Sequence, residues 1–439
     1  MMKNVLPLSS IISLRFFGLF LVLPLISLYA TTLDNATPFL IGVVVGGYAL
    51  TQMFFQVPFG VMSDKFGRKP TIIFGIVLFG IGSLICAVSS DIYMLILGRL
   101  LQGAGAIGAV VTAMISDLVK EEVRSKAMAV MGGTIAISFA LAMFFGPFLG
   151  GLYGMQILFW ITFAIAIISI IILVTIVPNP PKITHAYEEK TNYNLILKDS
   201  NLVKMNITNF LQKGLMTFAF VLIPVVMTKT FGFEVSDLYK VYLPALILGV
   251  IAMGPSAVIA EKKGKFKEMI ILGIVLFGLS FAIMGFSDSS VLFIIGITIF
   301  FVGFNIHEPI MQSLTTKFAK VNQKGAVLGV FNSFGYLGTF FGGLAGGYVI
   351  MLDGLAMVGI IVIVISLLWA VLISFMPNPS RLQNLYIDLE KVLRQNLNLL
   401  NGMSGISEWY INDSEKNVVI KYNKELISES EIVQKVSIV

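Results

Sequence analysis

The sequence predicts an all-α membrane protein, with twelve membrane-spanning helices in two pseudo-symmetric six-helix bundles and a small α+β domain after them. Three observations support this fold class. Hydrophobic residues make up 57% of the 439 residues and charged residues only 12%, which is too little polar surface for a soluble protein of this size. Apolar runs long enough to cross about 30 Å of hydrocarbon as helices recur along the chain. Landmarks of the first half also recur in the second half.

The apolar runs define the expected spans and domains. We place the spans at 8–30, 39–62, 70–89, 92–118, 125–153, 157–177, 203–227, 239–260, 269–286, 291–318, 326–350 and 355–376. The first run lacks a small-residue cleavage site, so we interpret it as a retained helix rather than a signal peptide. The expected domains are an N-terminal bundle, a cytoplasmic linker, a C-terminal bundle and a cytoplasmic domain, at 1–178, 179–200, 201–378 and 379–439.

The two halves carry matching landmarks about 199 residues apart. The motif Pro-Asn-Pro begins at Pro178 and again at Pro377. At nearly the same offset, Pro58, Asp64, Gly67 and Arg68 match Pro255, Glu261, Gly264 and Lys265. Parallel six-helix repeats imply two bundles that face each other across a central cavity, which is the architecture of a transporter.

Basic residues gather at alternate ends of the spans. They include Lys3, Lys65, Arg68, Lys69, Lys120, Arg124, Lys126, Lys182, Lys190, Lys198, Lys262, Lys263, Lys265, Lys267, Lys317, Lys320 and Lys324, and only Lys229 and Lys240 break the pattern. Because Lys and Arg in short loops mark the cytoplasmic side, we expect both termini there, in a bacterial inner membrane. The net charge of +6 then reflects topology rather than a nucleic-acid partner.

Cysteine and histidine are scarce. The single cysteine, Cys86, lies inside an apolar run, which excludes an internal disulfide and a cysteine-cluster metal site. We therefore expect no metal and no cofactor. The expected partners are the lipid bilayer, protons and a small-molecule substrate, and the expected state is a monomer.

A charged hinge with the sequence GVMSDKFGRK, at 60–69, separates the second and third spans. Gly60 permits close approach to a neighbouring helix, and Gly67 permits a tight turn. The charged members of the hinge are Asp64, Lys65, Arg68 and Lys69. An Asp beside a helix N-terminus gains from the helix dipole, so we expect Asp64 to latch one bundle to the other in one state only.

Three motifs resemble signatures of the major facilitator superfamily. The hinge is similar to the GxxxD-(R/K)-x-G-R-(R/K) signature, and 97–105, which contains Arg99, is similar to RxxQGxG of helix four. The stretch Gly146, Pro147, Phe148, Leu149, Gly150 and Gly151 resembles the GPxxGG signature of proton-coupled antiporters. The resemblance implies the twelve-helix fold of that superfamily, alternating access and a gating role for the hinge. The small C-terminal domain resembles the ferredoxin-like module of YajR-like members.

Two features qualify the gating role of the hinge. The second-half hinge has Ala257 in place of Gly60 and Phe266 in place of the last basic residue, so we expect a weaker copy around Glu261. Asp117, at the end of the fourth span, either joins the hinge basics in a charge relay or lies in a solvated loop. The alternative for the whole hinge is that its basic residues only anchor topology.

Ionisable residues within spans are rare and usually functional, and here they are Arg15, Arg99, Lys213, His307 and Glu308. Glu308 is the one carboxylate well inside a span, so it is the candidate for proton coupling. The alternative is a fixed buried ion pair, or a cap for the break at Pro309. Arg15 lies at comparable depth and is a candidate partner for Glu308. His307 points about 100° away around the helix and is a second proton-coupling candidate.

Other polar residues are candidates for the cavity. Arg99 either takes part in proton transfer or joins helices through hydrogen bonds, and Lys213 either lines the cavity or extends to the interface. The remaining candidates are Gln52, Asn209, Gln212, Asn305, Gln312 and Asn332. The 35 Phe and 21 Met residues favour a lipophilic substrate, although many of them face lipid.

The C-terminal domain predicts a strand at 385–389, a helix at 389–400, strands at 406–411 and 418–422, a helix at 428–436 capped by Ser428, and a short last strand. This order favours a ferredoxin-like domain. It has no Cys and no His, so we expect no metal there. Its role is either regulatory or that of a solubilising tail.

These patterns together predict a secondary transporter that exports a small lipophilic substrate in exchange for protons. An uptake symporter or a facilitator is the first alternative, because the first span lacks the acidic residue that many drug antiporters carry there. A membrane sensor that signals through the C-terminal domain is the second. An enzyme is not expected, since no nucleophile, base and orienting group occur together and no nucleotide-binding loop is present.

Overall fold

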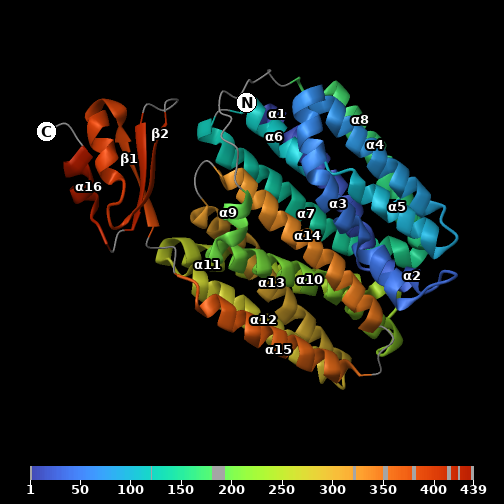
Figure 1. Cartoon of the computed structure of the whole chain (residues 1–439). Coiled ribbons are helices and arrows are strands. Elements are labelled where there is room, and N and C mark those ends of the chain that lie inside the picture. The colour runs from blue at the N-terminus through green and yellow to red at the C-terminus, as the bar shows by residue number, and fades with distance from the viewer. Residues whose placement is uncertain are drawn as a thin grey trace.

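The computed structural model describes residues 2–119, 121–179, 193–319, 323–349, 354–377, 382–412, 417–423 and 426–436. Within these ranges, twelve helices or broken helices are long and apolar enough to span a membrane. They form two bundles that lie side by side, with α3 (Pro38–Phe66) against α14 (Lys324–Val349) between them (Figure 1). The predicted helical membrane fold is confirmed.

The first bundle differs from the prediction at two helix breaks. Its helices are α1 (Met2–Val22), α2 (Ile26–Ala30), α3, α4 (Arg68–Ala87), α5 (Ile92–Ala104), α6 (Gly108–Leu118), α7 (Glu121–Tyr153) and α8 (Met155–Thr175). The span predicted at 8–30 breaks around Pro24, because proline lacks the amide hydrogen that a helix needs and clashes with the preceding turn. The span predicted at 92–118 breaks after Ala104, where Gly105 packs against the backbone of Gly75.

The second bundle follows a short helix, α9 (Tyr193–Lys198), which lies in the expected linker. The helices of the bundle itself are α10 (Ser200–Lys229), α11 (Tyr239–Lys263), α12 (Phe266–Gly285), α13 (Ser290–Phe318), α14 and α15 (Leu355–Ser374). Polar caps set several starts: Asp199 accepts from two backbone amides of α10, and Ser289 accepts from Leu292 at the start of α13. The rest of the linker, and the expected boundary at 378, lie outside the described residues.

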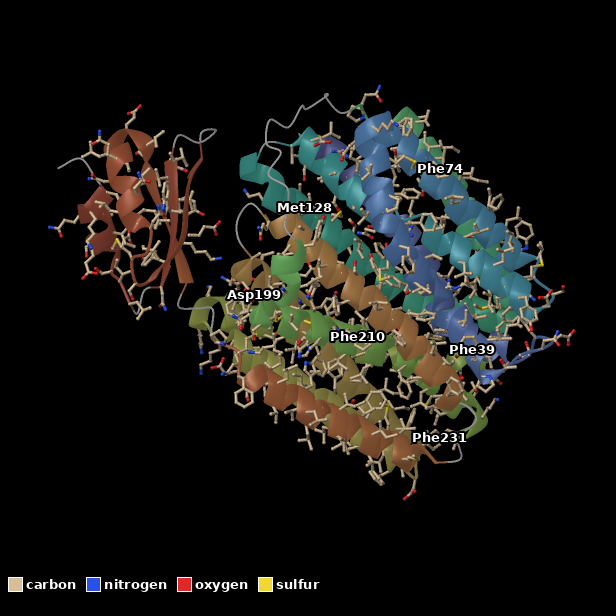
Figure 2. The ribbon with its side chains drawn as sticks, in the orientation of Figure 1. Phe39, Phe74, Met128, Asp199, Phe210 and Phe231 are labelled. Atoms are coloured by element: carbon tan, nitrogen blue, oxygen red, sulfur yellow. The ribbon has the colours of Figure 1, made fainter. Side chains whose placement is uncertain are left out.

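Among the described residues, the bundles pack together toward one end. Phe39 and Phe231 lie at the end far from the C-terminal domain, and Met128 and Asp199 lie at the end near it (Figure 2). We call these the Phe39 end and the lysine-rich end. At the Phe39 end, α3 and α14 are so close that a Cβ atom on Gly46 would lie 2.8 Å from the Cα atom of Phe340.

A second pair of helices, α7 and α11, also meets at the Phe39 end. The rings of Phe144 and Tyr239 lie 5.1 Å apart, and Gly151 packs against Ser236. Toward the lysine-rich end, by contrast, a Cβ atom on Gly132 or Gly329 would meet no atom within 4 Å. In the part of the chain that the structure describes, the bundles are therefore closed at the Phe39 end and apart at the lysine-rich end.

The C-terminal domain is a three-stranded antiparallel sheet with helices on it. The strands β1 (Leu382–Asp388), β2 (Ile406–Asn412) and β3 (Asn417–Asn423) pair in the order β1-β3-β2, and α16 (Glu429–Val436) follows. The hydroxyl of Ser428 accepts from the backbone amide of Glu431, so the predicted cap is confirmed. The predicted last strand lies outside the described residues.

The helix predicted at 389–400 is wrong. The chain forms two 3-10 helices instead, at Leu389–Lys391 and Arg394–Leu400. Asparagines at 396 and 398 disfavour the α-helix because their side chains compete for backbone hydrogen bonds. The domain also contacts the membrane part, since Lys421 of β3 donates to the carbonyls of Lys317 and Ala319, at 2.6 and 3.1 Å, where α13 ends.

Candidate functional site

The hinge at 60–69 is helical except at one residue, Gly67. α3 continues through Asp64 to Phe66, and only Gly67, with φ of 97°, separates it from α4. The predicted tight turn at Gly67 is confirmed. Asp64 lies in the last turn of α3 and pairs with Arg68 of its own bundle, so the expected latch between the bundles is not engaged in this conformation and stays a prediction.

Arg68 holds the hinge to the end of the fourth span. Its Nε lies 2.9 Å from the Asp117 carboxylate and its Nη1 lies 2.5 Å from Asp64. Asp117 therefore joins the hinge rather than a solvated loop. The Asp64 side chain is 70% exposed and Gly60 has no atom within 4 Å of an added Cβ, so neither makes its expected interhelical contact in this conformation. The other two basic members differ in burial: Lys65 is exposed and Lys69 is half-buried.

The second-half hinge reproduces this arrangement with the charges exchanged. Glu261, at the end of α11, accepts from the hydroxyl of Ser313 and lies 3.4 Å from Lys317. Both of these partners lie on α13, as Asp117 lies on the corresponding fourth span. Gly264 has a positive φ of 66°, like its counterpart Gly67. The copy is thus held by a surface ion pair, which contributes little to stability.

Glu308 forms an ion pair inside the second bundle. The Nζ atom of Lys213, on α10, lies 2.9 and 3.0 Å from the two carboxylate oxygens of Glu308, on α13. Gln212 donates to the same carboxylate at 3.1 Å. The Glu308 and Lys213 side chains are 36% and 24% exposed. Since charged side chains within spans usually face bundle interiors or aqueous cavities, we expect the pair to face the space between the bundles.

His307 points away from this pair, as its position on the helix predicts. It is fully buried, its Nε2 lies 2.7 Å from the carbonyl of Ile270, and its ring packs against Phe277 and Trp369. It therefore stabilises the contact between α12, α13 and α15 and does not face the open space.

Arg15 does not pair with Glu308. Its Nη2 donates instead to Gln52 at 3.3 Å and to the carbonyl of Gln102 at 3.5 Å. Gln52 in turn donates to the hydroxyl of Tyr336 at 2.8 Å, and this bond joins the two bundles. The expected pair between Arg15 and Glu308 is absent from this conformation because both side chains have nearer partners.

Arg99 is a buried link between helices. It donates to the carbonyl of Val44 at 3.1 Å and to Gln102 at 2.7 Å, and it lies 4.6 Å from the ring centre of Tyr48. These contacts join α5 to α3. They match the expected hydrogen-bond network, and the proton-transfer alternative for Arg99 stays a prediction.

The remaining cavity candidates divide by position. Asn209 is buried and donates to the carbonyl of Phe331 at 2.7 Å, so it joins α10 to α14. Asn305 is buried and donates within its own helix. Gln312 is exposed and Asn332 is half-buried. Only Lys213 and Gln212 share contacts with Glu308.

The glycines of the antiporter-like motif allow close packing of α7. Gly146 packs against the Leu21 carbonyl of α1, and Gly150 packs against Leu25 and Leu158. Gly151 reaches Ser236 of the second bundle. Pro147 lies inside α7 without interrupting it. The motif therefore lies at the closed Phe39 end, where it contacts both bundles.

Sequence reasoning missed Tyr336 and quoted Gln102 only as part of the motif at 97–105, without giving it a role. Gln102 stands three residues after Arg99, a spacing that places both on one helix face and that gave a usable signal. The sequence contains no comparable signal for Tyr336, because its partner Gln52 lies 284 residues away in the chain.

The chain is similar to known proteins. Residues 8–343 and 267–401 match the Major Facilitator Superfamily. The chain is 33% identical over 437 residues to the Inner membrane transport protein YajR of Escherichia coli (strain K12), which covers 97% of this chain and 95% of that protein. It is 26% identical over 357 residues to Multidrug resistance protein 2 of Bacillus subtilis (strain 168), which covers 76% of this chain and 86% of that protein.

A solved structure shows the same fold. The nucleoside transporter NupG aligns with a TM-score of 0.65 at 15% identity, over 85% of this chain and 98% of that chain. Together with the broken helices and the paired hinges, these matches settle the family. The chain belongs to the major facilitator superfamily, and it is a transporter rather than an enzyme.

Proposed function

We propose that this transporter exports a small substrate with an apolar body in exchange for protons, and that Glu308 carries the proton. The observation that supports this proposal is the ion pair between Glu308 and Lys213, which among the described residues is the one carboxylate pair away from the ends of the spans and whose side chains are partly exposed. The similarity to a protein named Multidrug resistance protein 2 favours export.

The pair provides a simple coupling step. A proton that binds a carboxylate oxygen of Glu308 neutralises it, and Lys213 then loses its counter-charge and becomes free to contact substrate. Release of the proton restores the pair. A permanently sealed pair would fit the alternative of a structural role, whereas side-chain exposures of 36% and 24% allow protons to exchange with water.

The hinge supplies the gate in this proposal. In the present conformation the Asp64 carboxylate pairs only within its own bundle, while the lysine-rich end is open. When that end closes, α3 approaches α14, and Asp64 can then meet the start of α14. In this proposal the contact between Asp64 and the start of α14 is absent in the present conformation and forms when the lysine-rich end closes.

The distribution of Lys and Arg among the connections supports one orientation of the protein in the membrane. Because the lysine-rich end carries the basic connections, we assign it and both termini to the cytoplasm of a bacterial cell, in the inner membrane. The present conformation is then inward-open. The transporter functions as a monomer in this proposal, since each chain carries both bundles and the whole path.

Proton exchange in reconstituted vesicles tests the proposal. Proteoliposomes with an acidic lumen and a trapped pH dye receive lipophilic cations, neutral compounds and anions in turn. Antiport predicts that a transported compound makes the lumen more alkaline. Symport predicts that the lumen does not become more alkaline under this gradient. A facilitator would move the substrate without moving protons. A sensor would move neither the substrate nor protons.

The variant Glu308→Gln isolates the proton site. We expect it to abolish substrate-induced proton release, because the amide cannot ionise. The control is Glu268→Gln, which removes an exposed acid at the start of α12, outside the space between the bundles. Unchanged proton release in Glu308→Gln would show that the proton site is elsewhere.

A further inference from the structure

The interior of the first bundle holds two buried arginines and no carboxylate. Arg15 is 1% exposed and Arg99 is 0% exposed. The acidic residues in the first 178 positions all lie at helix ends or in loops: Asp34, Asp64, Asp91, Asp117, Glu121 and Glu122. A buried charge is costly unless it is paired or fully hydrogen-bonded, so each arginine needs an explanation.

Arg99 is explained by its surroundings. It has a backbone carbonyl at 3.1 Å, a side-chain amide oxygen at 2.7 Å and the face of Tyr48 at 4.6 Å. These three contacts fix its position and engage its Nε and Nη1, while its Nη2 has no partner among the described residues. Arg99 therefore has a structural role in this conformation.

Arg15 lies 5.5 and 5.9 Å from the ring centres of Phe79 and Phe16, but its hydrogen bonds are weaker than those of Arg99. Its two hydrogen bonds, at 3.3 and 3.5 Å, both come from Nη2 and are at the long limit for such bonds. Its Nε and Nη1 are buried and have no partner within the described parts of the chain. The guanidinium thus offers several donors for which the protein supplies no acceptor.

A further donor without an acceptor lies beside it. The Tyr336 hydroxyl accepts from Gln52, and across the described residues its own proton has no acceptor. Gln52 also accepts from Arg15, so the three side chains form one chain of contacts. Donors therefore exceed acceptors here, and the missing component is an acceptor that carries negative charge.

The location suits a substrate. α3 and α14 are antiparallel, and their tight contact at Gly46 and Phe340 belongs to the closed Phe39 end. The bond from Gln52 to Tyr336 lies further along both helices, toward the end where the bundles part. Tyr336 itself is half-buried. The group of donors therefore lies near the base of the open space, at the contact between the bundles.

We propose that Arg15 and Tyr336 bind the anionic group of the substrate, and that the substrate is a small organic anion with an apolar body. This inference rests on the proposed function and names its substrate class. Binding would satisfy Arg15 and would involve both bundles at once, since Arg15 lies on α1 and Tyr336 on α14. The transported compound would then carry a carboxylate, sulfonate or phosphate group.

Binding to the purified full chain in neutral detergent tests this proposal without a proton gradient. The probes are benzenesulfonate, phenyl phosphate and the uncharged match benzenesulfonamide. We expect the two anions, and not the sulfonamide, to raise the melting temperature. The variant Arg15→Met should weaken anion affinity by about tenfold or more, which corresponds to one charge-assisted hydrogen bond. Tyr336→Phe should weaken it several-fold.

A second readout separates ligand binding from a structural role. Without ligand, Arg15→Met should raise the melting temperature by about 2 °C or more, because it removes an unpaired buried charge. The matched variant Arg99→Met should lower it, because Arg99 is bonded. A structural role for Arg15 predicts that both variants lose stability.

Several results would overturn the inference. These are equal effects of the sulfonamide and the anions, no effect of any anion, unchanged affinity in Tyr336→Phe, or a lower melting temperature in ligand-free Arg15→Met. Stabilisation by short-chain phosphatidylglycerol alone would identify a lipid headgroup instead and would also overturn it. Anion binding without proton exchange would contradict only the proposed antiport, whereas proton exchange without anion preference would contradict only this inference.

Discussion

Gly46 offers a way to change the balance between the two conformations. Its helix, α3, meets α14 so closely that a Cβ atom there would lie 2.8 Å from both the Cα atom and the carbonyl oxygen of Phe340. Both obstacles are backbone atoms, which cannot move aside by a rotamer change. We expect Gly46→Val to be incompatible with full closure of the Phe39 end.

The size of the effect follows from the cost of overpacking. Extra methyl groups in a tightly packed interface cost about 1–3 kcal/mol. A factor of ten in an equilibrium constant corresponds to about 1.4 kcal/mol. Gly46→Val should therefore shift the population away from the present conformation by roughly 5- to 150-fold.

Spin-label distances at the lysine-rich end measure this shift. Labels at Phe66→Cys on α3 and Gly329→Cys on α14 report the separation of the bundles, since Phe66 is 64% exposed and Gly329 faces open space. The native Cys86 is buried and stays unlabelled. We expect shorter distances in Gly46→Val.

The matched control for this measurement is Gly254→Val on α11, at a helix position where an added Cβ meets no atom within 4 Å. It has the same change in helix propensity and should leave the distances unchanged. If Gly46→Val also leaves the distances unchanged, or if both variants shift them equally, the closeness of α3 and α14 does not control access.

Two further changes test the hinge and the C-terminal domain. Asp64→Asn should increase the inward-open population in the same label experiment, because the amide cannot pair across the bundles when the lysine-rich end closes; an unaltered population would contradict the latch. Lys421→Met should leave the sheet folded but increase hydrogen exchange at the end of α13, because the carbonyls of Lys317 and Ala319 lose their donor. Unchanged exchange there would show that this contact does not hold the domain to the helix.

The helical architecture could be predicted because each span is an apolar run longer than the bilayer core is thick. The break at Pro24 was also within reach, since proline has a known effect on helices, but the uninterrupted apolar run concealed it. The failed helix at 389–400 shows the opposite case, in which leucine spacing fits a helix while the intervening asparagines oppose it. In both cases the local backbone preferences of a few residues, rather than the hydrophobic pattern, determined the secondary structure.

The site was only partly predictable. Glu308 could be singled out because a carboxylate within a span is rare. Its partner could not, because Lys213 is 95 residues away and the pairing depends on how α10 lies against α13. The bond between Gln52 and Tyr336 depends on the relation between two bundles, which a one-dimensional pattern does not contain.

The contact at the Phe39 end has a consequence for the energy that drives transport. Among the described residues no ion pair crosses between the bundles, and the crossing side-chain hydrogen bonds run from Gln52 to Tyr336 and from Ser27 to the carbonyl of Val221. The closed end is thus held mainly by dispersion forces, between small residues of α3 and α14 and between aromatic rings such as those of Phe144 and Tyr239. Parting it breaks few hydrogen bonds and no ion pair among the described residues. A difference of one pH unit, worth about 1.4 kcal/mol per proton, is already on the scale of this work.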